Sequence, residues 1–221
     1  MQSFKYLGLP TAVGKVADGT FDYVPDRIKG FVGWSENLLS CAGREVLLKA
    51  NAQAVLTYPM SCFKLPANTY QKMRTYISNY WWGSSIDSHK IHWQRWTRLT
   101  RSKGDGGMGF RDMPLFNQAM LGKQGWRLVV RPDSLCARVL KGKYYPNGEF
   151  LNANRRRKSS ETWKAILFGR EALMKGLTWR VGPGDINIWT DNWVGCPTAT
   201  RSLTRLDNVQ LEKVSQLFLP E

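Results

Sequence analysis

Acidic residues are the first place to look for chemistry, and in this chain they are dispersed. Phosphoryl-transfer enzymes that use two metal ions need clustered carboxylates to hold the cations roughly 4 Å apart, but no two acidic residues are adjacent in the sequence. Asp185 and Asp191 lie six residues apart around a turn, close enough to share a site. Their positions are better explained as a turn residue and a strand-end residue. The sequence therefore predicts no catalytic residues and no enzyme activity for the chain by itself.

Histidine, cysteine and glycine patterns predict neither a metal site nor a cofactor site. The two histidines, His89 and His92, lie within four residues of each other and are too few to support a nucleophile–base pair. Zinc ligands usually occur as close pairs, whereas the four cysteines are widely spaced, at Cys41, Cys62, Cys136 and Cys196. The glycine-rich segment 104–109 is followed by Phe110 and not by the Lys-Ser/Thr pair of a phosphate-binding loop. We expect this segment to be a flexible joint between helices.

Net charge is the strongest global signal. The 221 residues include 32 Lys and Arg against 17 Asp and Glu, which gives a formal charge of +15 at pH 7. Such an excess repels itself unless polyanions screen it, so it points to nucleic acid or an anionic membrane surface. No apolar run approaches the roughly 20 residues of a transmembrane helix, and the first residues lack the features of a signal peptide. We expect an intracellular protein whose partner is nucleic acid and not a membrane; a protein that is basic for other reasons is the alternative.

Two one-signed runs of basic residues make the phosphate backbone the expected target. The first spans 90–111 and the second spans 123–158, and each contains few acidic residues. Lysine and arginine neutralise phosphates and release counterions, which gives salt-dependent binding with little sequence preference. The alternative is a solvated helix face, where the signs of charge usually alternate. The candidates for nucleic-acid binding in these runs are Lys90, Arg95, Arg98, Arg101, Arg155, Arg156, Arg157 and Lys158.

Two of the ten tryptophans lie among these basic residues and are candidates for stacking on bases. They are Trp93 and Trp96, and stacking of a base on an aromatic side chain contributes roughly 1–3 kcal/mol. Helical spacing places three others in the core, namely Trp81, Trp126 and Trp163. Two more, Trp189 and Trp193, are expected to pack a C-terminal hairpin on the body of the protein.

Hydrophobic spacing predicts that helices dominate the first eighty residues. A short strand is expected at 4–9, and a helix is expected at 21–34. Ser40 can cap the next helix, and Pro59 is expected to end or kink it. Asn68 is expected to cap a third helix that follows Pro66.

The rest of the chain is predicted to be helical up to a small β element. Alternation at 90–93 predicts a short strand, and Asp112 and Ser160 are expected to cap two long helices. Another helix is expected at 133–144. The segment 178–193 carries two alternating stretches around a Pro-Gly-Asp turn, which predicts a β-hairpin. The predicted fold class is therefore mainly α, with a short N-terminal strand and a small C-terminal β-hairpin.

Five segments, read together, resemble a known family. They are FKYLGLP at 4–10, the stretch from GWSENLL to FKLP at 33–66, the stretch from NYWWGSS to GWRLV at 79–129, PDSLCARVLKGKYYP at 132–146 and TWRVGPGDINIWTDNW at 178–193. These segments resemble plant LINE-type (non-LTR) retrotransposon reverse transcriptases, which are RNA-directed DNA polymerases. They also resemble plant mitochondrial open reading frames derived from such elements. The resemblance covers nearly the whole chain.

The resemblance implies a division of the chain into four regions. Residues 1–20 correspond to the last strand of the polymerase palm, and 21–102 to a helical thumb-like region. Residues 103–175 correspond to a basic helical connector, and 176–221 to a hairpin and tail that precede a zinc-binding segment. In the family, the catalytic Asp-Asp motif comes before this stretch, while the zinc-binding segment and often a ribonuclease H domain come after it. We expect the chain to lack all three.

The resemblance also implies where nucleic acid is held. Lys5 and Tyr6 correspond to a region near the primer terminus. The thumb-like helices supply further candidates for phosphate contact, Arg44, Lys49, Lys64, Lys72 and Arg74. We therefore expect a reverse-transcriptase fragment that holds template–primer nucleic acid, as RNA–DNA hybrid or RNA, without polymerising it, and that has lost its palm-domain partner.

Two alternatives stay open at this point. One is an element relic or a protein-interaction module that binds no nucleic acid. The other is a truncated gene model of a full reverse transcriptase. The compartment follows the origin, because an intact element works in the nucleus and an organellar relic stays in the mitochondrion.

Overall fold

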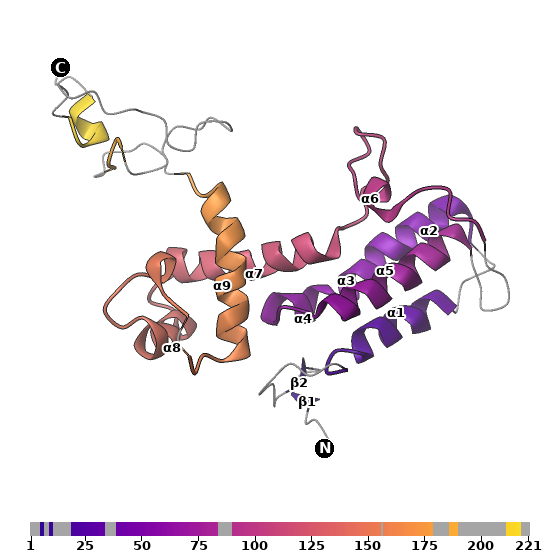
Figure 1. Ribbon diagram of the computed structural model, residues 1–221, viewed down its shortest axis with the longest axis horizontal. Coiled ribbons are helices and arrows are strands. Elements are labelled where there is room, and N and C mark those ends of the chain that lie inside the picture. Colours follow the sequence, from indigo (N-terminus) through magenta and orange to yellow (C-terminus); the bar gives the residue numbers. More distant parts are fainter. Residues whose placement is uncertain are drawn as a thin grey trace. The chain divides into compact units, whose positions relative to one another are not determined.

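The protein divides into two compact units, Met1–Leu173 and Met174–Glu221. The computed structural model describes residues 5–6, 9–10, 19–33, 39–83, 90–155, 157–178, 186–189 and 211–217, and at 5, 6, 10 and 31–33 it describes the backbone alone. Helices account for most of this described part (Figure 1). The predicted fold class, mainly α, is confirmed.

The short N-terminal strand is present, but it is folded back on itself. Strands β1 (Lys5–Tyr6) and β2 (Leu9–Pro10) pair antiparallel, with Tyr6 opposite Leu9. A single strand over 4–9 would have left its backbone N–H and C=O groups without a neighbouring strand. Pairing the two halves with each other satisfies part of this requirement.

The first core is built from residues 21–113. Helix α1 (Tyr23–Gly33) packs along α5 (Ala67–Trp82), and Phe21, Val24 and Ile28 are buried. Between these two helices the chain forms α2 (Cys41–Leu47), the π-helix η1 (Leu48–Ala52), α3 (Gln53–Val55) and α4 (Thr57–Cys62). Trp81 is half-buried against this core.

One of the predicted helix boundaries is confirmed, at Ser40, and one is wrong, at Asn68. The Ser40 side chain accepts a hydrogen bond from the Gly43 N–H, which makes Ser40 the N-cap of α2. Pro59 does not end its helix, which continues to Cys62. The regular α-helix is interrupted at Leu56, near the carbonyl with which the proline ring clashes. Asn68 does not cap α5, because the helix begins at Ala67 directly after Pro66.

The segment between the two long helices contains no strand at 90–93, contrary to the prediction. Residues 90–95 form neither helix nor strand, and the four-residue helix α6 (Trp96–Leu99) follows them. The glycine-rich segment then forms a closed loop, because the N–H groups of Met108 and Phe110 both donate to the Leu99 carbonyl. A Cβ atom at Gly107 would lie 2.2 Å from the Arg101 carbonyl oxygen. This loop therefore requires glycine at that position for close backbone approach.

The second core is built from residues 128–167. It contains α7 (Met113–Val130), α8 (Leu135–Tyr144), the 3-10 helix η2 (Phe150–Asn152) and α9 (Glu161–Gly176). The predicted caps are confirmed, because Asp112 accepts from the Leu115 N–H and Ser160 accepts from the Trp163 N–H. Trp163 is fully buried, as predicted, and stacks on Tyr144 at 4.6 Å between ring centroids.

The prediction that Trp126 lies in the core is wrong. Its side chain is 44% exposed. The buried stripe of α7 runs instead through Leu121, Gly125 and Leu128. Gly125 meets the ring of Phe150, since a Cβ atom there would lie 2.9 Å from that ring. Trp126 lies beside this stripe on the helix and faces away from it.

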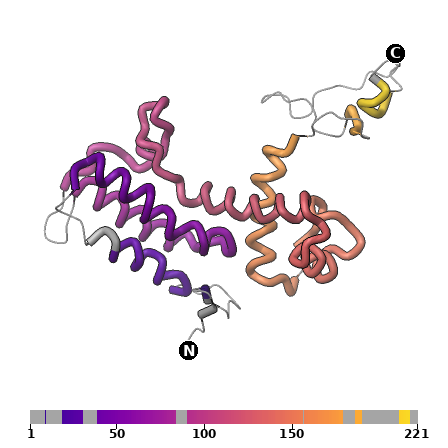
Figure 2. The backbone as a smooth tube through the Cα atoms, turned by 180° about the vertical axis from the view of Figure 1, so that it is seen from behind, coloured from indigo at the N-terminus to yellow at the C-terminus, as the bar shows by residue number. Residues whose placement is uncertain are grey.

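Helices α7 and α9 cross with their backbones in contact (Figure 2). A Cβ atom at Gly169 would lie 2.3 Å from the backbone nitrogen of Gly122. A Cβ atom at Gly122 would lie 3.1 Å from the carbonyl oxygen of Gly169. Only glycine at Gly169 allows this approach, so the crossing point is fixed by residue type.

Asn117 on α7 joins the end of α4 to the start of α5. Its side chain is completely buried, and its Nδ2 donates to the carbonyls of Met60, at 2.6 Å, and Phe63, at 3.0 Å. Its Oδ1 accepts from the backbone N–H of Leu65, at 3.0 Å, and from the Tyr70 hydroxyl. Each polar atom of the amide thus has two partners, and the connection between α4 and α5 has its backbone groups satisfied.

In the second unit, residues 186–189 lie alongside 211–214. Asn187 and Lys213 form an antiparallel bridge, flanked by hydrogen bonds from Ile188 N–H to the Glu212 carbonyl and from Val214 N–H to the Ile186 carbonyl. The Trp189 indole donates to the Leu211 carbonyl at 2.6 Å, and the 3-10 helix η3 (Val214–Leu217) follows. The first arm and turn of the predicted hairpin, together with Asp185, Asp191 and Trp193, lie outside the described residues.

Replacing Asn117 should strongly destabilise the first unit. Asn117→Ala leaves three buried backbone groups and the partly buried Tyr70 hydroxyl without their partner, and we expect the free energy of unfolding to fall by about 3 kcal/mol or more. Urea denaturation followed by circular dichroism measures the change. Asn51→Ala, at an exposed position of the π-helix, is the matched control and should change stability little. Equal losses in the two variants would contradict the role assigned to Asn117.

Two glycine-to-alanine changes should act in opposite directions. Gly169→Ala pushes a methyl group into the α7 backbone, and we expect a loss of about 2 kcal/mol or more. Gly142→Ala lies in α8, where a Cβ atom meets nothing within 4 Å, and it should add about 0.5–1 kcal/mol by restricting the unfolded chain. Thermal unfolding measures the melting temperatures of both variants. If Gly169→Ala is as stable as the native protein, the close backbone contact between α7 and α9 is wrong.

Candidate nucleic-acid interface

Among the described residues, no three His, Cys, Asp or Glu side chains come together as metal ligands would. None of the helices in that part of the chain is both long and apolar enough to cross a bilayer. The features that remain for a functional site are cationic side chains, exposed aromatic side chains and the grooves between them.

An open groove of about 530 Å³ lies between α5 and the segment that leads into α6, and we call it the α5–α6 groove. Its lining is Arg74, Thr75, Ser78, Asn79, His92, Gln94, Arg95, Trp96 and Thr97. Two arginines, two side-chain amides and two aromatic rings are therefore combined with hydroxyl groups. None of the lining residues is acidic.

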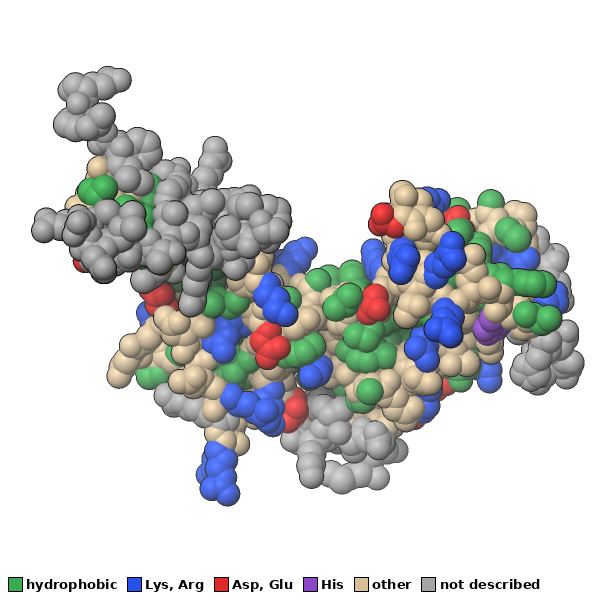
Figure 3. Space-filling view, turned by 45° about the horizontal axis from the view of Figure 1, so that its top comes forward, with side chains coloured by type: hydrophobic (Ala, Val, Ile, Leu, Met, Phe, Trp, Pro, Cys, Tyr) green, Lys and Arg blue, Asp and Glu red, His purple; other side chains and the backbone are tan. Residues whose placement is uncertain are grey.

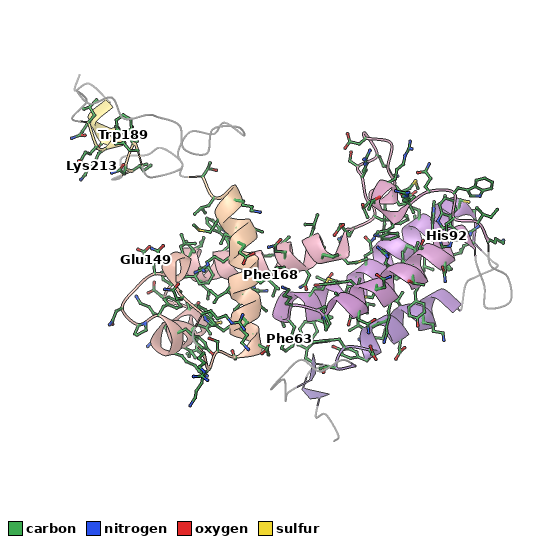
Figure 4. The ribbon with its side chains drawn as sticks, viewed as in Figure 1. Phe63, His92, Glu149, Phe168, Trp189 and Lys213 are labelled. Carbon is green, nitrogen blue, oxygen red and sulfur yellow. The ribbon has the colours of Figure 1, made fainter. Side chains whose placement is uncertain are left out.

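Aromatic contacts hold the 90–96 segment against the first core. The His92 ring stacks on Trp82 with 6.1 Å between centroids, and its Nδ1 lies 3.5 Å from the Ser78 hydroxyl. The Trp96 ring lies parallel to that of Phe110, with 5.8 Å between centroids. Figure 4 shows His92 at the end of the first unit that carries α2 and α6. These contacts position the groove although the segment has no regular secondary structure.

The electrostatic character of this surface comes from arginines without ion-pair partners. Arg74 donates to the Gln71 side chain at 3.2 Å. Arg95, Arg98 and Arg101 are exposed, and within the described part of the chain their guanidinium groups form no hydrogen bond or ion pair. Lys and Arg side chains gather on the region around the histidine (Figure 3). The arrangement can bind an anionic polymer without first breaking an internal ion pair.

The two tryptophans predicted to stack on bases have different environments. Trp93 is 76% exposed, and it lies between His92 and Gln94, both of which line the groove. Trp96 is half-buried and uses one ring face to contact Phe110. Trp93 is therefore exposed but does not itself line the groove, whereas Trp96 forms part of its wall.

Three of the predicted phosphate contacts are engaged within the protein. Arg44 donates to the Trp81 carbonyl at 3.3 Å, at the end of α5. Lys49 contacts both Glu45, at 2.7 Å, and the Met108 carbonyl. Lys72 forms an ion pair with Asp22 at 2.8 Å, and the hydrogen bond that Lys72 donates to the Asp22 carboxylate is the main reason why the pKa of Lys72 is raised. Their role in binding phosphate stays a prediction.

The first basic run also contains an exposed lysine whose charge is paired with a carboxylate of the protein. Lys103 lies 2.8 Å from Glu45, which is shared with Lys49. Hydrogen bonds from Lys103 and then Lys49 hold the pKa of the Glu45 carboxyl below its usual range. Lys90 is exposed and its side chain lies near Gly83, and it also takes part in a polar or electrostatic interaction. The charge of this run that forms no ion pair with a described residue therefore lies on Arg95, Arg98, Arg101 and Arg111, and the last of these lies over the Phe116 ring.

A second groove, of about 610 Å³, lies between the start of α5 and α9 within the first unit. Lys64 lies over the Phe168 ring at 3.9 Å, and Arg155 lines the same groove; Phe63 and Phe168 mark it in Figure 4. Glu161 and Glu171 also line it, so its charge is mixed. The structure thus brings Lys64 and Arg155 together and separates them from the α5–α6 groove.

The remaining candidates are placed only in part. Arg157 and Lys158 are exposed at the turn before α9, while Arg156 lies outside the described residues. Lys5 and Tyr6 are described by their backbone in β1. Sequence reasoning missed Ser78, Asn79 and Gln94 as groove residues. Their signal was weak, because single polar residues on an exposed helix face are common; the spacing of Arg74 and Ser78 by one helical turn was the only available indication.

Comparison with known proteins gives two relatives in Arabidopsis thaliana. The "Uncharacterized mitochondrial protein AtMg00310" is 37% identical over 143 residues, which is 64% of this chain and 93% of that protein. The "Putative ribonuclease H protein At1g65750" is 32% identical over 206 residues, which is 90% of this chain but 32% of that protein. Together these relatives are typical of open reading frames derived from plant retroelements. No protein-family model and no solved structure matches the chain.

Removing charge beside the α5–α6 groove should reduce the salt dependence of nucleic-acid binding. For Arg95→Ser/Arg98→Ser we expect the slope of log K against log salt to fall by about one to two, because each phosphate contact in a duplex contributes about 0.9. Fluorescence anisotropy across a salt series measures the slope. Arg27→Ser/Lys29→Ser removes the same charge from exposed positions on α1 and is the control. A similar fall in both variants would contradict a localised interface.

Proposed function

We propose that this chain, which belongs to the family of the Arabidopsis thaliana mitochondrial protein AtMg00310, is a retroelement-derived protein that holds nucleic acid and does not polymerise it. The observation that carries the proposal is the set of unpaired, exposed arginines beside a groove without acidic residues. Such a surface neutralises phosphates at little cost, because no internal ion pair has to be broken first.

The finer identity that we propose is a reverse-transcriptase fragment that contains the end of the palm, the thumb-like region and the connector. Its support is the order of the sequence segments that resemble LINE-type enzymes. The chain spans 32% of the length of the relative named as a ribonuclease H protein, so the activity of that longer protein does not transfer with the match. As ligand we propose RNA or an RNA–DNA hybrid, bound mainly through its backbone.

Protein interaction is the second candidate function, and exposed apolar side chains favour it. Val130 on α7 is 53% exposed, and Leu135 and Val139 on α8 are 76% and 59% exposed. Side chains of this kind are usually buried. In a longer polypeptide they could contact a palm domain. This candidate predicts that the purified chain self-associates or aggregates and that added nucleic acid does not prevent it.

The test is binding of the purified, folded chain to a labelled RNA–DNA primer–template across a salt series. We expect binding at low salt that weakens steeply as salt increases. Changing Arg155, Arg156, Arg157 and Lys158 to Ser should reduce the salt slope if the basic loop also contacts phosphate. Circular dichroism confirms that each variant is folded.

Two outcomes would contradict the proposal. If a demonstrably folded chain does not bind nucleic acid at low salt, its basic surface is only inherited from an ancestral element and the chain is a relic. If the pure chain extends a primer in the presence of Mg²⁺ and deoxynucleotides, the proposal that it does not polymerise fails. The second outcome is tested in the same samples with radiolabelled primer.

A further inference from the structure

We infer that α7 carries a second phosphate-binding surface, formed by Lys123, Arg127 and Arg131, which follows the backbone of one nucleic-acid strand. We call these three residues the α7 row. The inference rests on the proposed nucleic-acid binding and adds to it a site outside the α5–α6 groove. It gives the second half of α7 a binding role besides that of joining the two cores.

The spacing of the three cations is the first observation. Lys123 and Arg127 lie within α7, and Arg131 is its C-cap. They recur every four residues, so neighbouring members lie about 6 Å apart along the helix axis and on the same side of the helix. This separation is close to that between neighbouring phosphates of one strand, and the side chains are long enough to accommodate the difference. The helix therefore presents its cations at intervals that match the anions of a strand.

The buried side of α7 fixes where the row points. Leu121, Gly125 and Leu128 are buried, whereas all three members of the α7 row are exposed. The Phe150 ring packs so closely on Gly125 that a Cβ atom there would lie 2.9 Å from it. The helix cannot rotate about its axis without breaking this packing. The α7 row is therefore held towards solvent.

The charge of the row is not compensated by carboxylates of the described chain. In residues 113–148 the only acidic residue is Asp133, and no member of the row forms an ion pair with a described residue. Arg127 donates to the neutral side chain of Gln124 at 3.2 Å. In this respect the row differs from Lys49 and Lys72, which are paired with carboxylates. Phosphates that reach the row can bind without displacing an internal anion.

A strand backbone fits this face of α7 better than an anionic membrane does. A helix that lies on a membrane inserts its apolar side into the headgroup region, but the apolar side of α7 is already buried in the protein. On the exposed side, Trp126 and Val130 are 44% and 53% exposed. A membrane also presents its charges at no fixed spacing, whereas a strand presents them at regular intervals. We therefore assign the row to nucleic acid.

The α7 row and the α5–α6 groove are separate surfaces of the first unit. Trp96 in the wall of the groove contacts Phe110, shortly before α7 begins at Met113. Lys123 lies about 15 Å from Met113 along the helix axis, and Figure 1 shows α7 running from α6 to α8. A ligand that contacts both surfaces must extend along α7. The losses of binding caused by changes at the two surfaces should therefore add.

The test removes charge from the row and measures binding to the labelled RNA–DNA primer–template by fluorescence anisotropy across a salt series. For Lys123→Gln/Arg127→Gln we expect the slope of log K against log salt to fall by about one to two, because each phosphate contact contributes about 0.7–0.9. Glutamine is a good helix former, so α7 should be preserved, which circular dichroism checks. Arg27→Gln/Lys29→Gln removes the same charge from exposed positions on α1 and should change the slope little.

A gain of binding provides a second readout that misfolding cannot imitate. Ala119 is exposed one helical turn before the row, so Ala119→Lys extends the row by one cation and should raise the slope by about 0.7–0.9. Asn51→Lys adds the same charge at an exposed position of η1 and should raise it less. Combining Lys123→Gln/Arg127→Gln with Arg95→Ser/Arg98→Ser should lower the slope by the sum of the two separate losses.

Three outcomes would overturn the inference, and they are distinguishable. If the native chain binds but Lys123→Gln/Arg127→Gln behaves like the α1 control, the inference is wrong while the proposed function stands. If the folded native chain does not bind nucleic acid at low salt, the proposed function itself is wrong. If the row variant keeps the native slope with nucleic acid but loses binding to phosphatidylglycerol vesicles, the row serves a membrane surface and not a strand.

Discussion

The fully satisfied amide of Asn117 is the interaction on which the first unit depends. It is completely buried on α7 and bonds to Met60, Phe63, Leu65 and Tyr70. These partners lie at the end of α4, in the connection that follows and on α5. Burial raises the pKa of the Tyr70 hydroxyl, which therefore stays protonated and able to donate at physiological pH. The position of α5, and with it one wall of the α5–α6 groove, follows from this contact.

Helix α7 also makes the second contact that constrains the fold, this time with α9, which follows it in the sequence. Five residues beyond Asn117, Gly122 meets Gly169 of α9 at backbone distance. The first core ends at Met113 near the start of α7, and the second begins at Leu128 near its end. A single 18-residue helix thus joins both cores through one amide and one glycine pair. Both contacts require a particular residue type and not merely an apolar one.

Local signals in the sequence were sufficient for most of the helices and caps. Ser40, Asp112 and Ser160 each bond to a backbone N–H three residues later, so the information lies within one turn. The predictions that failed depended on distant partners. The spacing around Trp126 indicated a core residue, but Gly125 occupies the buried position because Phe150 packs there. Residues 90–93 alternate like a strand, yet His92 is held by a ring of α5 and not by a neighbouring strand.

In the candidate site, too, the outcome depends on distant partners, because they decide which cationic side chains are paired within the protein. Composition predicted a basic protein but could not separate the cations that bind within the protein from those that face solvent. Lys49 and Lys103 share Glu45, and Lys72 is paired with Asp22, so these charges support the fold first. Arg95, Arg98 and Arg101 lie on a short helix and loop that expose them. Net charge therefore overstates the surface available to phosphate, and three of the exposed, unpaired arginines lie within eight residues of Trp93, which is itself 76% exposed.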